Sequence, residues 1–324
     1  MQTIAVYRAA FIAHLETKIT TRKPKNLYEP ITYILGLGGK RLRPVLTLMS
    51  TEFFGGSYKE ALDAALAIEV FHNFSLVHDD IMDEAPLRRG KITVHEKWDV
   101  NTGILSGDAM LINAYQCFEG YTPQTFKQLI TLFSKTAIEV CEGQQYDVDF
   151  ETRDDVTLEE YLEMISYKTA VLVATAMQMG AIIAEAPVVS QEQLYAFGLN
   201  LGIAFQLQDD YLDAFGDPKT FGKQVGGDII ANKKTILYLK ALELAAPEQR
   251  LALLQLYSIQ PKDANEKIET AKAIFKESGA ADFTQQEIAR YTAKAFAVLE
   301  QIAVSKDRKD VLLTFGKQLM NRQV

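Results

Sequence analysis

Apolar residues recur along this chain at helical spacing, and five long segments carry the pattern without an internal proline. These segments are rich in Ala, Leu, Glu, Gln and Met, which favour helix. Convincing runs that alternate apolar and polar residues, as strands do, are not found. The pattern therefore predicts an all-α protein, with helices over 60–83, 125–150, 158–185, 191–213 and 233–244.

Glycine, proline and asparagine gather between the helical segments, as turns require. No Ser/Pro-rich linker and no clean short repeat divides the chain. With 324 residues, 48% of them hydrophobic, the chain can build a sizeable core. We therefore expect residues 1–324 to form one domain of roughly ten to thirteen helices. The expected breaks are 36–39, 55–57, 86–90 and 216–227.

The longest apolar run, residues 171–184, predicts a buried helix and no transmembrane segment. At about 14 residues it falls short of the roughly 20 that a bilayer requires. His14 and Glu16 interrupt the apolar residues near the N-terminus, which argues against a secretory signal. Neither Cys117 nor Cys141 belongs to a CxxC pair, so we expect two buried thiols in a reducing cytoplasm.

The overall charge narrows the range of partners. The formal net charge is −8, so a broad attraction to nucleic acid or anionic lipid is not expected. An anionic substrate would need a local cluster of cations, or bound metal ions, to overcome this charge. The sequence contains candidates for both.

A first aspartate cluster ends the predicted helix 60–83. On that helix, His72, Ser75, Asp79 and Asp83 recur at steps of three or four residues and form one stripe, with Asp80 beside it. Like charges at this spacing destabilise a helix, and its C-terminal end is the worst place for carboxylates. A sequence that accepts both penalties indicates a bound cation, and this spacing suits Mg²⁺.

The alternative is a solvated acidic helix end. Two features favour the metal site over it. The aspartates follow an apolar helix, residues 61–77, and Arg88 and Arg89 come directly afterwards. Guanidinium groups suit bidentate binding of phosphate, so metal and diphosphate would be bound side by side.

A second aspartate cluster repeats the arrangement. Gly202, Gln206, Asp209 and Asp213 form a stripe, Asp210 lies beside it, and a Gly-rich loop follows. The repetition is far more specific than either copy. Two such helix ends could face each other and hold several Mg²⁺ ions against one diphosphate.

Three basic stretches could supply further cations. Residues 38–44, Gly-Gly-Lys-Arg-Leu-Arg-Pro, form a basic turn entering a helix, where backbone amides favour phosphate. Lys168 and Thr169 lie inside an otherwise apolar helix, while Lys223 and Lys233 belong to a loop that could close as a lid. Taken singly, each stretch has an ordinary alternative, a solvated loop or a lysine that reaches solvent.

Together these segments resemble the trans-isoprenyl (polyprenyl) diphosphate synthase family. The resemblance implies an all-α fold with a central cavity, usually a homodimer, and about three Mg²⁺ ions per active site. It implies that isopentenyl diphosphate condenses with an allylic diphosphate and pyrophosphate leaves. The matching pieces are 38–44, 79–83 with 88–90, Gly143-Gln144 with Asp147, 168–169, 205–206 with 209–213, and Lys223 with Lys233.

The resemblance also implies a role for each matching residue. Mg²⁺ ligands are expected at Asp79, Asp83 and Asp209, with Asp80, Asp210 and Asp213 nearby. Isopentenyl diphosphate is expected at Lys40, Arg43, His72 and Arg89. The allylic diphosphate is expected at Arg88, Lys168, Thr169, Gln206, Lys223 and Lys233. The residues expected to carry catalysis are Asp79, Asp80, Asp83, Lys168, Thr169, Gln206 and Asp209.

Product length is expected to depend on the helix before the first cluster. In this family, bulky residues on the preceding turns act as a floor for the growing tail. Ser75 is small, whereas Phe71 and Phe74 lie deeper, which suggests farnesyl or geranylgeranyl diphosphate. By the family resemblance, the absence of an insertion within residues 79–83 favours geranylgeranyl. The alternative is that both phenylalanines merely pack against a neighbouring helix.

Four other functions fit parts of this pattern. A terpene cyclase would need neither the basic turn nor the second DDxxD. A non-catalytic synthase subunit would not need intact aspartates at both clusters. A helical cation-binding scaffold would leave the arginine pair and the lysines unexplained. A longer-chain polyprenyl diphosphate synthase differs only in product length.

Overall fold

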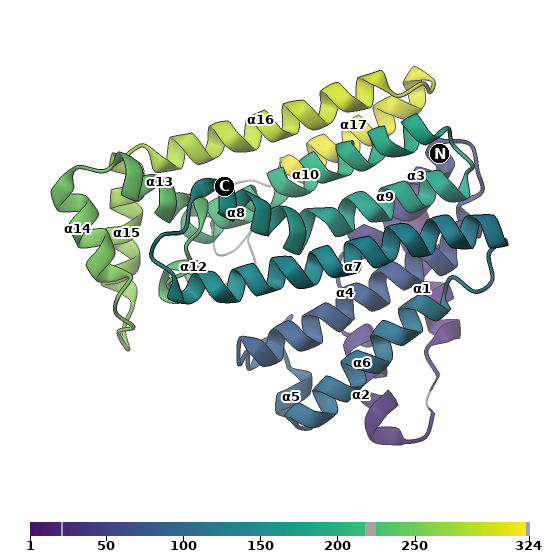
Figure 1. Cartoon of the computed structure of the whole chain (residues 1–324), viewed down its shortest axis with the longest axis horizontal. Helices are drawn as coiled ribbons and strands as arrows, with labels where there is room; N and C mark the ends of the chain where they lie inside the picture. Colours follow the sequence, from purple (N-terminus) through teal and green to yellow (C-terminus); the bar gives the residue numbers. More distant parts are fainter. Residues whose placement is uncertain (21, 218–224, 322–324) are drawn as a thin grey trace. The chain divides into compact units, whose positions relative to one another are not determined.

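The computed structural model describes residues 1–20, 22–217 and 225–321. It is helical almost throughout (Figure 1), which confirms the predicted all-α class. The described residues contain 16 α-helices, more than predicted, because short helices such as α5 (Val94–Lys97) and α12 (Gly227–Ile230) were not foreseen. They also contain one hairpin of two-residue strands, β1 (Leu87–Arg88) and β2 (Lys91–Ile92), in the break expected at 86–90.

The chain divides into two compact units. Unit 1 comprises Met1–Lys135 and Thr175–Tyr195, and unit 2 comprises Thr136–Ala174 and Ala196–Val324. Three helices contribute residues to both units, namely α7 (Pro123–Thr152), α9 (Val171–Ile183) and α10 (Val188–Phe215).

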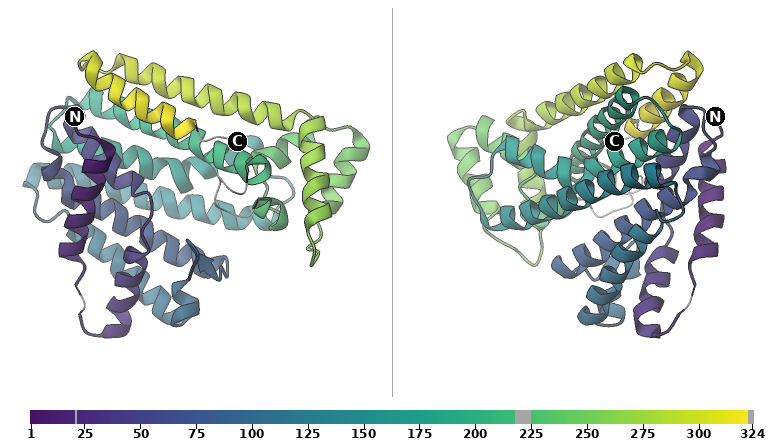
Figure 2. Two further views of the ribbon diagram at one scale, coloured as in Figure 1. Left: turned by 180° about the vertical axis from the view of Figure 1, so that it is seen from behind. Right: turned by 45° about the vertical axis from the view of Figure 1, so that its right-hand side comes forward.

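Unit 1 is built around α4 (Leu62–Met82), the helix that leads to the first aspartate cluster. Within this unit α4 packs against its neighbours α3 and α6 (Figure 2). A 3₁₀ turn, Tyr58–Ala61, precedes α4. The remaining helices are α1 (Ile4–Lys18), α2 (Lys25–Gly36), α3 (Leu42–Phe53), α5 and α6 (Val100–Gln116).

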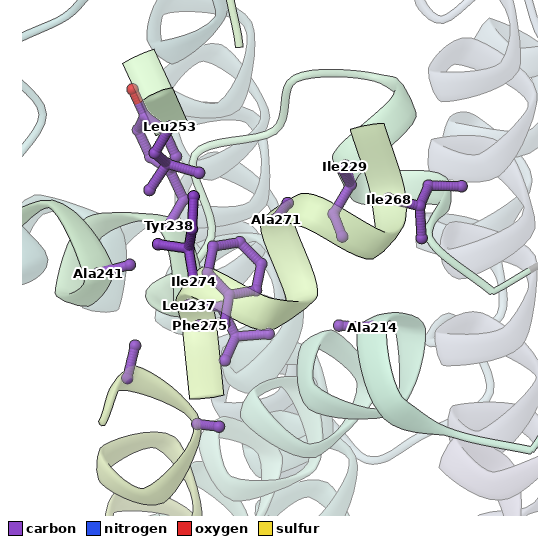
Figure 3. Close-up of a cluster of buried hydrophobic side chains, with 12 residues drawn as sticks. Ala214, Ile229, Leu237, Tyr238, Ala241, Leu253, Ile268, Ala271, Ile274 and Phe275 are labelled. Atoms are coloured by element: carbon purple, nitrogen blue, oxygen red, sulfur yellow. The ribbon is translucent and has the colours of Figure 1, made fainter. Parts of the chain in front are cut away.

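Unit 2 has its own core, in which α13, α14 and α15 pack around Tyr238, Leu253 and Phe275 (Figure 3). Ala214 from the end of α10 and Ile229 from α12 belong to the same cluster, so this core supports the chain that follows the second aspartate cluster. The helices are α8 (Leu158–Ile165), α13 (Ile236–Leu244), α14 (Pro247–Leu256), α15 (Asn265–Glu277), α16 (Ala280–Gln301) and α17 (Lys306–Met320).

The segment predicted as one helix over 158–185 is interrupted. Helix α8 begins with a capping box between Thr157 and Glu160, and α9 follows only after a π-helical turn, Ser166–Ala170. A Cβ at Gly143 of α7 would lie 2.3 Å from the backbone nitrogen of Lys168, so α7 approaches this turn very closely. Turns of this kind occur frequently at functional sites.

The apolar run over 171–184 forms most of α9 and is buried along nearly its whole length, as predicted. None of the helices in the described residues is long and apolar enough to cross a membrane.

The prediction of two buried thiols is wrong. Cys141 lies on the exposed side of α7, beside Ile138 and Glu142, and Cys117 is the partly buried residue that caps α6.

Candidate active site

The first aspartate cluster lies at the C-terminal end of α4, in unit 1. Helix α4 ends at Met82, and Asp83 caps it. Asp80 is almost fully buried, and its Oδ1 accepts a hydrogen bond from Arg88 Nε at 2.7 Å. Arg88 also lies 3.4 Å from Asp79 Oδ2. Burial raises the pKa of Asp80, and the hydrogen bond and charge of Arg88 offset only part of that rise.

The hairpin that follows α4 holds Arg88 in place. Its turn contains Arg89 at φ +53° and Gly90 at φ +72°, and glycine adopts such left-handed geometry at little cost. At the base of the hairpin, the Thr93 hydroxyl donates to the carbonyl of Ala85 at 2.8 Å. The hairpin is thereby tied to the end of α4, where Arg88 meets the aspartates.

A cationic cluster surrounds His72 in the same unit. Arg43 Nη1 lies 3.2 Å from His72 Nε2. Burial and the charges of Arg43 and Arg89 hold the pKa of His72 well below its ordinary value, so the neutral ring nitrogen accepts this hydrogen bond. Arg89 donates to the carbonyl of Gly38, in the turn that carries Lys40. The predicted isopentenyl diphosphate residues thus gather around one turn and one histidine.

Arg43 Nε and Asp80 Oδ2 are buried and have no hydrogen-bond partner within the part of the chain that the structure describes, and the same holds for Asn73 Oδ1 and both ring nitrogens of His95. A buried donor or acceptor without a partner costs free energy and indicates that a water or a ligand completes it. The arginine donor suits a phosphate oxygen, and the carboxylate oxygen suits a cation.

The second aspartate cluster lies near the end of α10, in unit 2. Gln206 Nε2 donates to Asp210 Oδ1 at 2.9 Å, and Tyr161 donates to the other oxygen of the same carboxylate. The hydroxyl of Thr169 donates to Gln206 Oε1 at 3.1 Å. Burial and the neighbouring charge of Asp228 raise the pKa of Asp210 well above its ordinary value. A chain of hydrogen bonds therefore connects the π-helical turn to this cluster.

Two predicted lysines share one carboxylate in unit 2. Lys168 Nζ lies 2.6 Å from Asp147 Oδ2, and Lys233 Nζ lies 3.8 Å from the same oxygen. Burial alone would raise the pKa of Asp147, but the charges of Lys168 and Lys233 outweigh it and lower the pKa. The ammonium groups of Lys168 and Lys233 therefore both lie within ion-pair distance of the Asp147 carboxylate.

These groups line a cavity of about 120 Å³ in unit 2. Asp213, at the far end of the cluster, accepts a hydrogen bond from the amide of Asp228 at 2.9 Å. The cavity walls combine cations, carboxylates and apolar side chains, as a site for an apolar molecule with an anionic head requires. Its lining includes Asp147, Phe150, Tyr161, Met164, Lys168, Thr169, Gln206, Asp210, Asp228 and Lys233.

The predicted chain-length residues belong to an aromatic cluster in unit 1. Phe71 and Phe74 are buried, with ring centroids 5.5 Å apart, and Phe71 lies 5.2 Å from Phe133 of α7. Ser75 donates to the carbonyl of His72 at 2.9 Å. Phe71 therefore does pack against a neighbouring helix, and Phe133 joins the set of candidates.

Sequence reasoning missed several residues of the two clusters. Tyr161 and Asp228 carry no motif, and Asp147 was quoted in the resemblance without a role. Glu69 lay unnoticed on the helix before the first cluster, although a carboxylate inside an apolar helix is an unusual feature. Lys223 lies outside the described residues, and the predicted approach of the two helix ends stays a prediction.

Comparisons with known proteins agree with this geometry. The family model described as polyprenyl synthetase matches residues 24–275. A geranylgeranyl diphosphate synthase of Sulfolobus acidocaldarius is 38% identical over 297 residues, covering 90% of this chain and 89% of that protein. A geranylfarnesyl diphosphate synthase of Natronomonas pharaonis is 37% identical over 313 residues, covering 91% and 87%.

Solved structures give the same result. A crystal structure of a geranylgeranyl pyrophosphate synthase has 55% sequence identity and a TM-score of 0.96, and the match covers 100% of both chains. The geranylgeranyl pyrophosphate synthetase of Pyrococcus horikoshii has 36% identity and a TM-score of 0.87, with 98% of this chain and 100% of that one covered.

An all-α chain with two carboxylate-ended helices, each beside a cation cluster, defines the class of isoprenyl diphosphate synthases. The chain belongs to the polyprenyl synthetase family. It is a prenyltransferase, and its reaction is the trans elongation of a prenyl diphosphate chain. The family and the reaction class predicted from the sequence are therefore confirmed.

Enzymes of this family generally use Mg²⁺, and the residues present fit it. Among the described residues, no group of three His, Cys, Asp or Glu side chains is placed to hold a metal ion by itself. Mg²⁺ usually takes one or two protein carboxylates and completes its shell with water and substrate phosphates. The carboxylates at the end of α4, where Asp80 Oδ2 is buried without a hydrogen-bond partner among the described residues, suit an ion that binds together with a diphosphate. Those at the end of α10 suit such an ion in their own unit.

Proposed function

We propose that Lys40, Arg43, His72 and Arg89 bind the diphosphate of isopentenyl diphosphate. The observation that carries this proposal is Arg43 Nε, a buried donor without a partner beside a neutral histidine. Because Arg43 Nη1 is already hydrogen-bonded to His72, the guanidinium is held in one orientation, which suits anion binding through Nε. This diphosphate does not react, so a rigid arginine site suits it.

The allylic diphosphate belongs to the other cations in this proposal. Arg88, Lys168, Thr169, Gln206, Lys223 and Lys233 bind it, and Asp79, Asp83 and Asp209 are the Mg²⁺ ligands, about three ions completing the site. Bound Mg²⁺ would stabilise the negative charge that develops on the leaving diphosphate. Support comes from Lys168 and Lys233, which share one carboxylate and could turn from it to a substrate phosphate.

The chemical step then follows from simple charge separation. The allylic C–O bond breaks, and its electron pair leaves with the diphosphate. The double bond of isopentenyl diphosphate attacks the allylic cation, and the departed pyrophosphate takes the proton that is lost. No protein nucleophile is required. Thr169 holds Gln206 Oε1 in a fixed orientation, so that this amide oxygen can stabilise the cation.

We propose geranylgeranyl diphosphate as the main product. Several relatives bear the name geranylgeranyl diphosphate synthase, and Phe71, Phe74 and Phe133 form an aromatic cluster below Ser75. If this cluster is the floor, Phe71→Ala with Phe74→Ala lengthens the product. Unchanged product length in the double variant, measured by mass spectrometry, would place the floor elsewhere.

We also propose that the active form is a homodimer. Helix α6 exposes Val100, Ile104, Leu105 and Ile112, and Leu105 and Ile112 are each about 60% exposed. Their spacing places them along one side of the helix. An apolar row of this kind marks an interface. Light scattering should give twice the mass of the chain, and Leu105→Glu with Ile112→Glu should yield the monomer mass.

Two smaller expectations from the sequence remain proposals. The chain folds as one domain, because α7, α9 and α10 run through both units without a break. A single calorimetric unfolding transition supports this, and two separated transitions contradict it.

The protein is cytoplasmic, where free thiols such as Cys117 and Cys141 stay reduced.

A direct assay tests the proposed function. The purified protein is incubated with Mg²⁺, isopentenyl diphosphate and, in separate tubes, dimethylallyl, geranyl or farnesyl diphosphate. A single geranylgeranyl product from every starter, lost with EDTA, is expected. Hydrocarbon released from an allylic diphosphate alone would indicate a terpene cyclase, and no reaction a non-catalytic subunit.

A further inference from the structure

One arginine of the basic turn faces the interior rather than the site. Arg41 stands between Lys40 and Arg43 in the sequence, yet its side chain is only 5% exposed. It forms an ion pair with Glu69 of α4 and donates to the carbonyl of Leu35. A charge is buried in this way only when it is paired, because desolvation is costly.

Glu69 is held as firmly as its partner. Its side chain is 3% exposed, and Oε1 also accepts a hydrogen bond from Asn73 Nδ2 at 3.2 Å. The same amide group donates to the backbone carbonyl of Glu69 at 2.8 Å. The carboxylate is therefore fixed to α4, the helix that also carries His72 and the first aspartate cluster.

The backbone at Arg41 depends on this anchor. Arg41 adopts φ +49°, a left-handed geometry that is unfavourable for a residue other than glycine, and α3 begins directly after it. The carbonyl of Arg41 accepts a backbone hydrogen bond from Val45 at 3.2 Å, and the side-chain contacts to Glu69 and Leu35 add to it in holding this geometry. The orientation of Lys40 and the start of the helix that carries Arg43 therefore both depend on the ion pair.

The same turn also positions Arg89. Gly38 accepts a hydrogen bond from the Arg89 guanidinium, and a Cβ at Gly39 would lie 3.0 Å from Arg89 Cζ. The charge of Glu69 acts on Arg43 and Arg89 as well, and raises the pKa that burial lowers at each of them. One buried carboxylate thus compensates a group of arginines that would otherwise repel each other.

We propose that Arg41 and Glu69 are a positioning pair that sets the affinity for isopentenyl diphosphate without touching it. The pair fixes the turn at residues 38–41, and the turn places Lys40, Arg43 and Arg89. This inference rests on the proposed function of that cluster.

The test must separate positioning from stability. Glu69→Gln alone leaves a buried guanidinium without a counter-charge, and that protein is expected to fold poorly. Replacing both members by an apolar residue of similar size usually preserves stability. The decisive variant is therefore the double variant Arg41→Met with Glu69→Met, with Arg41→Lys as the variant that keeps the charge but loses the planar guanidinium.

We expect the double variant to fold and to raise the KM for isopentenyl diphosphate by about tenfold or more. The KM for the allylic diphosphate and kcat should change by less than about threefold. Arg41→Lys should show the same split, even if the double variant fails to fold. A KM for isopentenyl diphosphate that stays normal in the folded variants would overturn the proposal, because the pair would then be structural only.

Two controls complete the design. Glu52 of α3 accepts a hydrogen bond from Tyr7 at 2.6 Å, outside the cluster, so Glu52→Gln should leave both KM values unchanged. If Glu52→Gln produces the same split, the effect is a general loss of order in unit 1 and the proposal is wrong. Lys40→Ala tests the site itself. If it leaves the KM for isopentenyl diphosphate normal, the site assignment fails, and the proposal with it.

Discussion

The cation clusters of the two units are built from different residues. In unit 1 they are mostly arginines, held by a backbone carbonyl, a neutral histidine and a buried glutamate. In unit 2 they are lysines that share Asp147, and Lys168 and Lys233 are 26% and 34% exposed. The guanidinium group of arginine is planar, rigid and permanently charged, whereas lysine carries its ammonium group at the end of a flexible chain.

This difference corresponds to two different tasks. A diphosphate that is bound, kept and released with the product benefits from a rigid set of donors. A diphosphate that leaves during the reaction gains charge, and mobile cations can follow it as the bond breaks. On this account, unit 1 provides most of the binding of the unreactive diphosphate. Unit 2 provides much of the charge stabilisation as the reactive diphosphate leaves.

The largest effect is expected at the first aspartate cluster, because the reactive diphosphate cannot leave when its developing charge is not stabilised. Asp79→Asn should lower kcat by roughly a thousandfold, or about 4 kcal/mol of transition-state stabilisation. Glu84→Gln, two residues beyond the helix end, is the matched control and should retain near-normal turnover. Near-normal turnover of Asp79→Asn would end the assignment of Asp79 as a ligand.

One substitution in each unit tests whether the two cation clusters have different tasks. Lys168→Gln should lower kcat by about a hundredfold and leave the KM for isopentenyl diphosphate within about threefold of normal. Arg43→Lys should do the reverse, raising that KM by about tenfold with little change in kcat. Steady-state kinetics with each substrate varied in turn separates the two patterns. If Lys168→Gln and Arg43→Lys change kcat and the KM for isopentenyl diphosphate equally, the two clusters do not have different tasks.

The smallest effect is expected from Tyr161→Phe. The loss of its hydroxyl leaves one oxygen of buried Asp210 without its donor, which should lower the free energy of unfolding by about 1–2 kcal/mol. Urea denaturation measures this change. If Tyr161→Phe is as stable as the unchanged protein, the hydrogen bond contributes nothing.

The sequence predicted the helices that carry both aspartate clusters, because an apolar 3.6-residue period and the DDxxD spacing are local patterns. It could not predict the π-helical turn at Lys168, which depends on the close approach of α7 at Gly143. Nor could it pair Arg41 with Glu69 or Lys168 with Asp147, since these contacts join distant segments. Motifs therefore located the charged groups, and only the fold identified their partners.

The most direct test of the account is the metal dependence of binding for each substrate alone. Isothermal titration of isopentenyl diphosphate and of a non-ionising thio analogue of an allylic diphosphate would be compared in Mg²⁺ and in EDTA. We expect the Kd of isopentenyl diphosphate to change by less than about threefold, because arginines bind it, and the analogue to weaken by about a hundredfold or more in EDTA. Loss of isopentenyl diphosphate binding in EDTA, to the same extent as the analogue, would contradict the division of tasks between the two clusters.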